Sequence, residues 1–485
     1  MRSPTRVPLA VALAALLVLA GCASPSAPAT TGEDGTTDRT PTTTAPTETT
    51  APETGTSTTD ETTAKTTTTT GEAVNPPDPP EDRLGWEEGY WYNESVSVTA
   101  EDGYDQEELE RIVARTMARL EVIRQLEFTS EVSVEVITRE EYRERNVFDF
   151  EPDPWQDQVY EALFLVDEDT HAADDLEDVY GGSVAGYYSG GDIVLVGDDP
   201  DAVEVDRSTL AHELVHALQD DQLRLASYGR TIDGVSATRG LTEGEANYVM
   251  DRYQERCASE WQCIPTQAGG SSNRSYNVGI FLTLFTPYSD GPELMADLYE
   301  REGWTAVNDA YDSPPVSTEQ LIHPDAYPDE TPVDVRVEDR SNRTWERFGQ
   351  RRNRERVGEA GIYAMFWNNG VVPRSHLRTD DARYNYSHPV SDGWGGDAVV
   401  PYRNGDEYGY VFKTAWDTEE DAQEFHDSYL ELLEGHGAER VSENVYVIPD
   451  DDPYGDAFRV VKNGDRVIVV NGPSVEALKG IHPRK

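Results

Sequence analysis

The sequence predicts an α+β protein that is preceded by a long disordered N-terminal segment. Stretches with apolar residues at helical spacing and stretches with alternating apolar residues occupy separate blocks of the chain, which is typical of this class. Residues 23–80 consist mainly of Thr, Pro, Glu and Ser. Such a composition cannot bury enough apolar surface to offset backbone entropy, so we expect a disordered stalk there. About 400 of the 485 residues are then left to fold.

The first 22 residues have the order of an export signal. Arg2 and Arg6 precede the apolar run 7–20, which is too short to span a bilayer comfortably. The run ends in Leu-Ala-Gly-Cys, which resembles the lipobox of secreted lipoproteins. This resemblance implies cleavage before Cys22 and a lipid on that residue, so we expect anchoring at the outer face of the cell membrane. The alternative is an unmodified signal peptide whose cysteine occurs by chance.

The charge of the chain excludes one class of partner. A net charge of −53 and a pI near 4.3 argue against nucleic acid, whose binding needs a basic surface. Only five of the 40 Lys and Arg residues are lysines. This combination resembles proteins adapted to very high salt, where screening reduces the repulsion between acidic groups. The alternative is an acidic secreted protein from moderate salt.

Two further features fit an exported chain. Cys257 and Cys263 are the only cysteines besides Cys22, and we expect them to form a local disulfide outside the cell. Two thiols at this spacing do not suit a zinc knuckle. Sequons for Asn glycosylation occur at four positions: Asn93, Asn273, Asn342 and Asn385.

The segment 81–340 is expected to form one domain that is rich in helices. The helix 107–128 is predicted from apolar residues at helical spacing, the strand 132–138 from alternation, and a helix after Pro154 from its favourable first position. Ser-Gly-Gly-Asp at 189–192 predicts a hairpin whose second arm is 193–196. Further helices are predicted at 208–219, 241–254, 276–285 and 292–300.

A composition break at 340–356, rich in Arg and Asn, predicts a boundary. The segment 357–485 then forms a separate C-terminal α+β module. Its pattern predicts helices at 357–367 and 419–433, and strands at 398–402, 408–416, 441–448, 458–462 and 467–470. No internal repeat is found in the sequence.

The stretch "STLAHELVHALQ" carries the chemistry. Residues four apart lie on one face of a helix, so His212 and His216 can present two imidazole nitrogens to one metal ion. Glu213 lies about 100° further round, where its carboxylate can reach a water beside the metal. The alternative is an ordinary amphipathic helix that carries two histidines by chance.

A second stretch, "LTEGEANY", supplies a third ligand by resemblance. A helix with Glu-Gly-x-Ala, a few tens of residues after His-Glu-x-x-His, resembles the gluzincin zinc metallopeptidases, in which the Glu before the Gly binds the metal. This maps the ligand onto Glu243 and implies Zn²⁺ as the cofactor. Glu245 is about 200° round the helix from Glu243, so both carboxylates cannot face one ion. Alternatively, Glu243 is a carboxylate in the first turn of a helix, where the helix dipole favours a negative charge.

The wider pattern, which includes "PPVSTEQLIHPDAY" and "GWGGDAVVPY", resembles a group of exported, largely uncharacterised surface lipoproteins of haloarchaeal type. The resemblance covers about 107–472 and implies a zincin-like metallopeptidase fold for 81–340. It also implies that Glu213 acts as general base on water and passes the proton to the leaving amine. A peptide or protein substrate would lie along an edge strand, for which the resemblance suggests 193–196.

The sequence also suggests residues for oxyanion stabilisation and for orienting the metal ligands. A gluzincin also stabilises the oxyanion, and His323 is our candidate for this catalytic role, with Tyr327 and Tyr248 behind it. A histidine hydrogen-bonded in a Pro-rich turn is the alternative for His323. Asn247, or Asp220 and Asp221, could orient the metal ligands. "PDDDPYGD" at 449–456 suggests calcium, but its spacing misses the EF-hand pattern, and a solvated turn is the preferred interpretation.

The sequence thus favours a cell-surface zinc metallopeptidase that cleaves peptides or proteins. A second hypothesis is a non-catalytic adhesion or interaction lipoprotein that retains a zincin fold, because the stalk and the C-terminal module carry no catalytic signature. A solute-binding lipoprotein is a third, although nothing in the sequence resembles paired α/β lobes.

Overall fold

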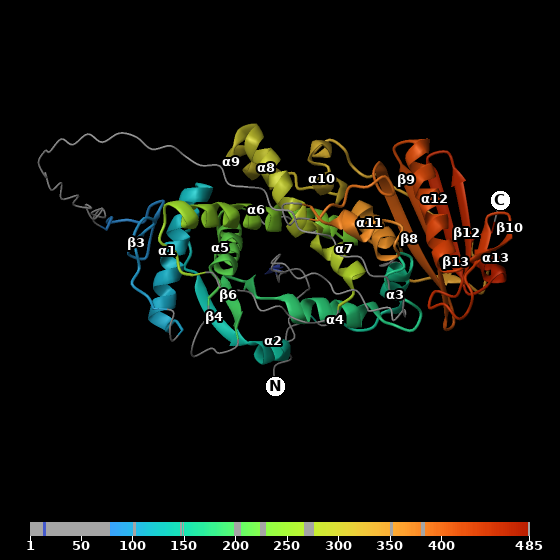
Figure 1. The fold of residues 1–485 in the computed structure, drawn as a ribbon, viewed down its shortest axis with the longest axis horizontal. Coiled ribbons are helices and arrows are strands. Elements are labelled where there is room, and N and C mark those ends of the chain that lie inside the picture. The colour runs from blue at the N-terminus through green and yellow to red at the C-terminus, as the bar shows by residue number, and fades with distance from the viewer. Residues whose placement is uncertain are drawn as a thin grey trace, which may run out of the picture. The chain divides into compact units, whose positions relative to one another are not determined.

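The fold is taken from a computed structural model that describes residues 13–15 and most of 78–483. Outside the description lie 1–12, 16–77, 100–102, 146–147, 149, 198–204, 224–228, 266–275, 350–352, 380–383 and 484–485. Cys22, Asn273 and nearly all of the predicted stalk fall in these gaps. Helices dominate the first half of the described chain and an antiparallel sheet dominates the second half, so the α+β class is confirmed (Figure 1).

Helices build most of the part that carries the two motifs. They are α1 (Gln106–Arg124), α2 (Arg139–Arg145), α3 (Pro154–Glu161), α4 (Ala172–Ser183), α5 (Arg207–Gln222), α6 (Ile232–Ser259), α7 (Val278–Ser289), α8 (Gly291–Glu302), α9 (Trp304–Ala310) and α10 (Glu319–Ile322). Helix α1 begins with a capping box at Asp105 and buries its apolar stripe. Helix α5 packs against α6, which also contacts α1, α7 and α8.

Helix α6 is longer than its sequence pattern indicates. The periodicity predicts 241–254, whereas the helix spans Ile232–Ser259 and begins at the cap Thr231, whose side chain accepts from the N–H of Gly234. Glycines within a helix normally lower its propensity, and two of them, Gly234 and Gly240, precede the predicted start and hide the true one. Here Gly240 and Gly244 face close neighbours, so tertiary packing explains why these positions lack side chains.

A small sheet lies beside α5. Its order is β1 (Leu13–Ala15), β5 (Gly186–Ser189), β6 (Asp192–Gly197) and β4 (Ser133–Thr138). The predicted hairpin at 189–192 is confirmed, with Gly190 and Gly191 at positive φ. The expectation that 193–196 forms an edge strand is wrong, because β6 pairs with β5 on one side and with β4 on the other. Ile193, Val194 and Leu195 are all buried, which is typical of an interior strand covered on both faces.

The second sheet is antiparallel throughout and follows the order β10-β11-β12-β13-β9-β8-β7. Its strands are β7 (Glu346–Arg347), β8 (Trp394–Asn404), β9 (Glu407–Trp416), β10 (Glu439–Ser442), β11 (Val445–Val447), β12 (Ala457–Asn463) and β13 (Arg466–Gly472). Helices α11 (Gly358–Asn368), α12 (Glu419–Gly435) and α13 (Val475–Ile481) accompany it, and a two-stranded ribbon, β2 (Trp86–Glu87) with β3 (Tyr90–Trp91), precedes α1.

Both faces of the second sheet are buried, because side chains alternate along each strand. Val399 and Phe412 pair across β8 and β9 and belong to the core that includes α11 and α12. The next pair, Val400 and Val411, belongs to the smaller core beneath α13, with Leu478. The larger core also takes in α3, α4 and α7, so the hydrophobic interior continues across the predicted boundary at 340–356.

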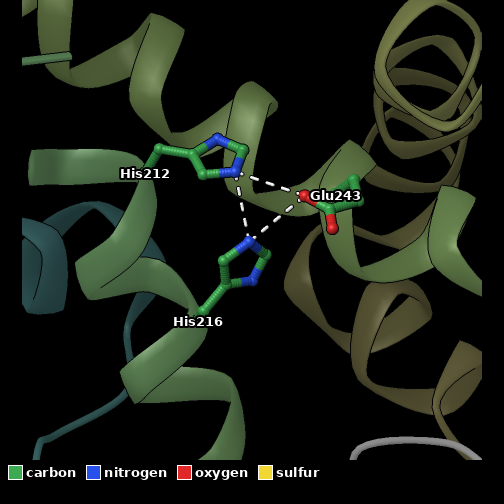
Figure 2. A group of neighbouring side chains, drawn as sticks. All are labelled: His212, His216 and Glu243. Atoms are coloured by element: carbon green, nitrogen blue, oxygen red, sulfur yellow. Dashed lines mark hydrogen bonds and ion pairs between the residues drawn. The ribbon is translucent and has the colours of Figure 1, made fainter. Parts of the chain in front are cut away.

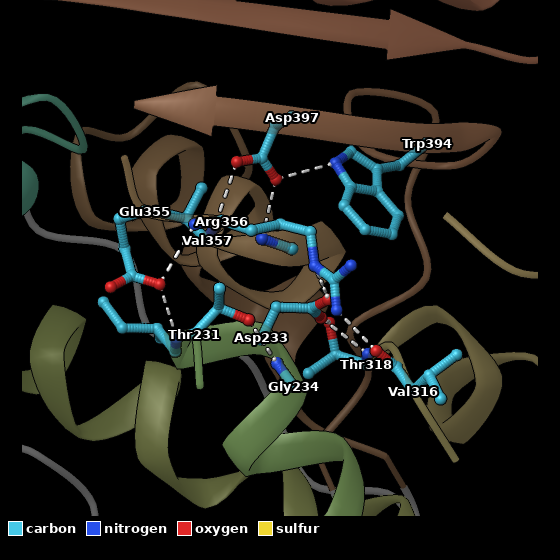
Figure 3. Close-up of polar contacts among 12 residues, drawn as sticks. Thr231, Asp233, Gly234, Val316, Thr318, Glu355, Arg356, Val357, Trp394 and Asp397 are labelled. Atoms are coloured by element: carbon cyan, nitrogen blue, oxygen red, sulfur yellow. Dashed lines mark hydrogen bonds and ion pairs between the residues drawn. The ribbon is translucent and has the colours of Figure 1, made fainter. Parts of the chain in front are cut away.

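A polar network joins the start of α6 to the second half of the chain (Figure 3). The Asp233 carboxylate accepts from the N–H and hydroxyl of Thr318 at 2.7 and 2.8 Å and pairs with Arg356 at 2.8 Å. Gly358 has φ +77°, and a Cβ there would lie 2.1 Å from the Asp233 carboxylate. Asp397 accepts from the N–H of both Val357 and Gly358 at 2.9 Å. Contacts with the C-terminal part of the chain therefore fix the N-terminal end of α6, the helix that carries Glu243.

No helix among the described residues has the length and apolar character needed to cross a membrane.

Candidate metal centre

Helix α5 presents the first motif. Asp206 caps the helix by accepting from the N–H groups of Ser208 and Thr209 at 2.9 and 3.0 Å, so the helical spacing is established before the motif begins. His212 and His216 follow one turn apart and both are fully buried. Each therefore needs a polar partner within the protein.

Helix α6 brings the second motif to the same place. The side chain of Glu243 is buried and faces the two imidazoles, as Figure 2 shows. The glycine that follows has a packing role. A Cβ on Gly244 would lie 2.5 Å from the backbone of Gly291 at the start of α8, so only glycine allows this close helix contact.

Three ligand atoms converge in this centre (Figure 2). Nε2 of His212 lies 3.1 Å from Nε2 of His216, and the Glu243 Oε2 lies 3.3 and 3.2 Å from these two nitrogens. Ligands at zinc distances of about 2.0–2.1 Å in a tetrahedral arrangement lie about 3.3 Å apart. The residues present therefore fit one zinc ion, with a fourth position left for water or substrate.

Second contacts aim both imidazoles at the centre. Nδ1 of His212 lies 2.9 Å from the amide oxygen of Asn247, and Nδ1 of His216 lies 2.8 Å from that of Gln219. These contacts place a proton on each Nδ1 and leave each Nε2 free to bind a metal. Asn247 is one of the residues that the sequence suggests for this role, whereas Gln219 is not and could be suspected only from its position three residues after His216.

Glu213 lies at the centre without a fixed partner. It is fully buried, and neither carboxylate oxygen accepts a hydrogen bond. Burial raises its pKa to about 8, with His216 opposing the rise and Glu243 adding to it. The backbone N–H of Tyr188 in β5 also opposes the rise, although it lies outside hydrogen-bonding geometry. An uncommitted buried carboxylate is the form that a general base requires.

The charges of the three ligand residues depend on one another. Burial lowers the pKa of His212. Burial acts in the same direction on His216, but the Glu243 carboxylate outweighs it and raises the pKa of His216 to about 9. Burial raises the pKa of Glu243, yet the two imidazoles lower it to about 2. The Glu243 carboxylate is thus paired with the positive charge of His216, and a bound dication would take the place of that positive charge.

Glu245 is not part of the centre. Its carboxylate binds the Arg124 guanidinium and the Tyr311 hydroxyl, and it accepts from Gln219 at 3.0 Å. Helical geometry explains the division, because Glu243 and Glu245 point to different sides of α6. Glu245 instead holds α1 and the loop after α9 against α6.

Arg239 is a residue that the sequence analysis missed. It lies one turn before Glu243 on α6, and its Nη1 is 3.3 Å from the Tyr180 hydroxyl. Burial lowers the pKa of Arg239, but Tyr180, Tyr288 and Glu243 together raise it above the usual value. A cation near the Glu243 carboxylate is a second candidate for oxyanion stabilisation. The spacing of Arg239 could have revealed it, because a residue four positions before Glu243 lies on the same face of a helix.

His323 lies in a different cluster. Its Nε2 is 3.0 Å from Glu359 and 3.7 Å from Asp392, and the Glu359 hydrogen bond is the main reason that its pKa is raised. Among the described residues it makes no hydrogen bond or ion pair with the three metal ligands. Tyr327 donates to the carbonyl of Ser313. The catalytic role of His323 stays a prediction.

The remaining predicted residues are placed as follows. The ring of Tyr248 makes a tilted contact with Tyr299 and an edge-to-face contact with Trp304. Asp220 accepts from the Tyr188 hydroxyl, and Asp221 accepts from Thr129 and Ser130. Cys257 and Cys263 form a disulfide with a Cα–Cα distance of 5.5 Å. Among the sequons, Asn93 and Asn342 are exposed and Asn385 is half-buried.

Comparison with known proteins covers only the C-terminal part. Residues 346–482 match a family described as a domain of unknown function, DUF8575. Searches of curated proteins and of solved structures gave no match. The matched region includes the whole second sheet and α11 to α13, and it does not include the metal ligands.

Proposed function

We propose that this protein is a gluzincin-like zinc peptidase at the outer face of the cell membrane, held there by a lipid on Cys22. One observation carries the proposal. His212, His216 and Glu243 converge at zinc-like spacing, and the buried carboxylate of Glu213 stands beside them without a hydrogen-bond partner. A purely structural metal site would have no use for such a carboxylate.

The chain's own groups divide the work of hydrolysis. When bound, zinc supplies a Lewis acid that acidifies water and polarises a peptide carbonyl. Glu213 would be ionised beside that dication, accept the proton of the attacking water and donate it to the leaving amine. Arg239, or His323 if the substrate reaches it, would stabilise the developing negative charge on the carbonyl oxygen.

Strand β5 is the better candidate for the substrate strand. It contacts α5, and the backbone N–H of Tyr188 in β5 is close enough to affect the pKa of Glu213. It pairs antiparallel with residues 13–15, which belong to the predicted signal peptide. Removal of that peptide would free this edge, and an extended peptide could then add to it by β-strand pairing. This interpretation replaces the sequence-based choice of 193–196.

The proposal is tested with the purified chain in high salt. We expect about one zinc per chain and cleavage of peptides from a broad library. Glu213→Gln should retain zinc, because Glu213 is not a ligand, and lose activity by about 10²-fold or more. Equal cleavage by wild type and Glu213→Gln would refute the peptidase. Zinc binding without any turnover in the wild type would instead favour the non-catalytic adhesion or interaction protein.

A further inference from the structure

A second group of acidic side chains lies outside the candidate metal centre, where the chain after α3 meets the second sheet. Glu161 ends α3, Glu168 follows in the next loop, and Asp456 precedes β12. Each offers a carboxylate oxygen, and the three oxygens lie within 4.8 Å of one another. These three residues are called the carboxylate cluster below.

The carboxylate cluster is largely buried and lacks a positive partner. Glu161 and Asp456 are only 7% and 5% exposed, and Glu168 opens to solvent. The strongest charge effects on all three come from other acids, and no ion pair to Lys, Arg or His is found for them among the described residues. Burial and Glu168 raise the pKa of Asp456 to about 8. Repulsion between carboxylates this close disfavours the ionised form of all three, and a cation between them would remove that repulsion.

Two buried amides lie beside the carboxylate cluster. Gln158 donates its amide N–H to Glu161, and Asn471 donates to Asp456 at 2.7 Å. The amide oxygens of both residues are buried and accept no hydrogen bond. Asn471 is fully buried and Gln158 is 5% exposed, so water does not reach them freely. Buried acceptors without donors are rare in folded proteins and point to a missing partner.

We propose that the carboxylate cluster binds a structural calcium ion. Calcium takes 6–8 oxygen ligands at about 2.3–2.6 Å, so two oxygens on one ion lie at most about 5 Å apart. The carboxylate cluster meets this limit and offers no nitrogen or sulfur ligand, which disfavours zinc and other transition metals. Its ligands would be the three carboxylates, water on the open side of Glu168, and the oxygens of the two amides once each amide turns its oxygen toward the ion.

The calcium would join two parts of the chain. Between Glu161 and Glu168, Phe164 is fully buried and packs against Tyr454 and Phe458, with ring centroids 4.8 and 5.6 Å away. Glu161 and Glu168 thus flank the residue that docks on the matched C-terminal domain, and Asp456 belongs to that domain. The acidic run 449–456, which alone misses a calcium pattern, gains its missing ligands from a segment almost 300 residues earlier.

The test uses the full chain with zinc held saturating, so that it is independent of the proposed peptidase. Terbium serves as the calcium probe. Its emission can be sensitised by nearby tyrosines, and the charge of Glu161 contributes to the raised pKa of Tyr410, Tyr429 and Tyr454, which indicates that these rings are close to the carboxylate cluster. We expect sensitised terbium emission that millimolar calcium displaces and equimolar magnesium does not. Calcium should also raise Tm by at least about 2 °C.

Variants locate the effect. Glu168→Gln, at an exposed position, should fold normally and weaken calcium affinity about tenfold. Asp456→Asn should abolish the calcium-dependent rise in Tm, while its calcium-free Tm stays equal to or above that of wild type, because repulsion is relieved. Glu319→Gln, in another acidic group with Glu330 and Asp417, is the matched control and should respond like wild type. An unchanged response in Glu168→Gln and Asp456→Asn, or no response in wild type, would overturn the proposal.

Discussion

At the scale of single residues, the candidate centre depends on which carboxylate of "EGEA" faces the imidazoles. Glu243 lies within 3.3 Å of both histidines, whereas Glu245 is committed to Arg124, Gln219 and Tyr311. Two acids that are two positions apart on α6 therefore have separate tasks. One faces the two imidazoles, and the other neutralises a buried arginine.

Paired substitutions separate these tasks. Glu243→Gln should lower zinc affinity at least about 10-fold, because it removes one of three protein ligands. Glu245→Gln should retain zinc but lower the free energy of unfolding by about 3 kcal/mol, because the Arg124 guanidinium loses its buried partner. Zinc affinity is measured by chelator competition and stability by urea unfolding. Loss of zinc in Glu245→Gln with retention in Glu243→Gln would reverse the assignment.

At the scale of elements, the centre is built where α5 and α6 cross and where α8 begins. The contact of α6 with α8 is close enough for backbone to meet backbone at Gly244 and Gly291. The position of Glu243, one residue before Gly244, is thereby coupled to this packing. Position 244 therefore needs a residue without a side chain so that α6 and α8 can approach, and not because Gly244 takes part in the chemistry of the centre.

Gly244→Ala tests this coupling. The added Cβ would lie 2.5 Å from the Gly291 backbone, so α6 and α8 must separate. We expect a loss of about 1–3 kcal/mol in the free energy of unfolding, together with weaker zinc binding. Gly435→Ala at the end of α12 is the control, because nothing lies within 4 Å of its added Cβ. Unchanged stability and zinc affinity in Gly244→Ala would show that the helix contact does not position Glu243.

At the scale of the whole molecule, this strongly acidic chain also buries some of its acidic side chains in the interior. Glu319 is 4% exposed, and one of its carboxylate oxygens has no hydrogen-bond partner. Burial, reinforced by Glu359 and Glu330, raises the pKa of Glu319 from 4.5 to about 9. The folded state therefore holds this proton more tightly than the unfolded state does.

A pH dependence of stability follows with a definite sign. Because the pKa of Glu319 is raised on folding, its contribution to the free energy of unfolding is largest at low pH, where Glu319 is protonated in both states. This contribution falls as the pH rises from about 4.5 to about 9. Glu319→Gln should flatten this decline and be at least about 1 kcal/mol more stable than wild type at pH 8. Urea unfolding at pH 5 and pH 8 in constant high salt measures it, with the exposed Glu431→Gln as control. A parallel decline in Glu319→Gln would contradict the assignment.

Much of the secondary structure could be predicted from local pattern. Helix α1, strand β4, the β5–β6 hairpin and most strands of the second sheet follow periodicity and turn residues, which act over a few residues. Pattern failed where partners are distant. Strand β6 was expected at an edge, but β4 covers its second side. Helix α4 is a different case, because it was not predicted although its buried residues Leu176, Val179 and Tyr180 lie at helical spacing among its acids.

The sequence by itself determined the residue types of the site, since the i, i+4 histidines and the later glutamate are properties of two short helical stretches. Only the tertiary structure decided that these stretches meet, that Gln219 and Asn247 orient the imidazoles, and that Glu245 turns away. It also brought Asp456 to Glu161 and Glu168. The physical reason is that spacing along a helix sets direction locally, whereas distances between helices and sheets depend on how their buried surfaces pack.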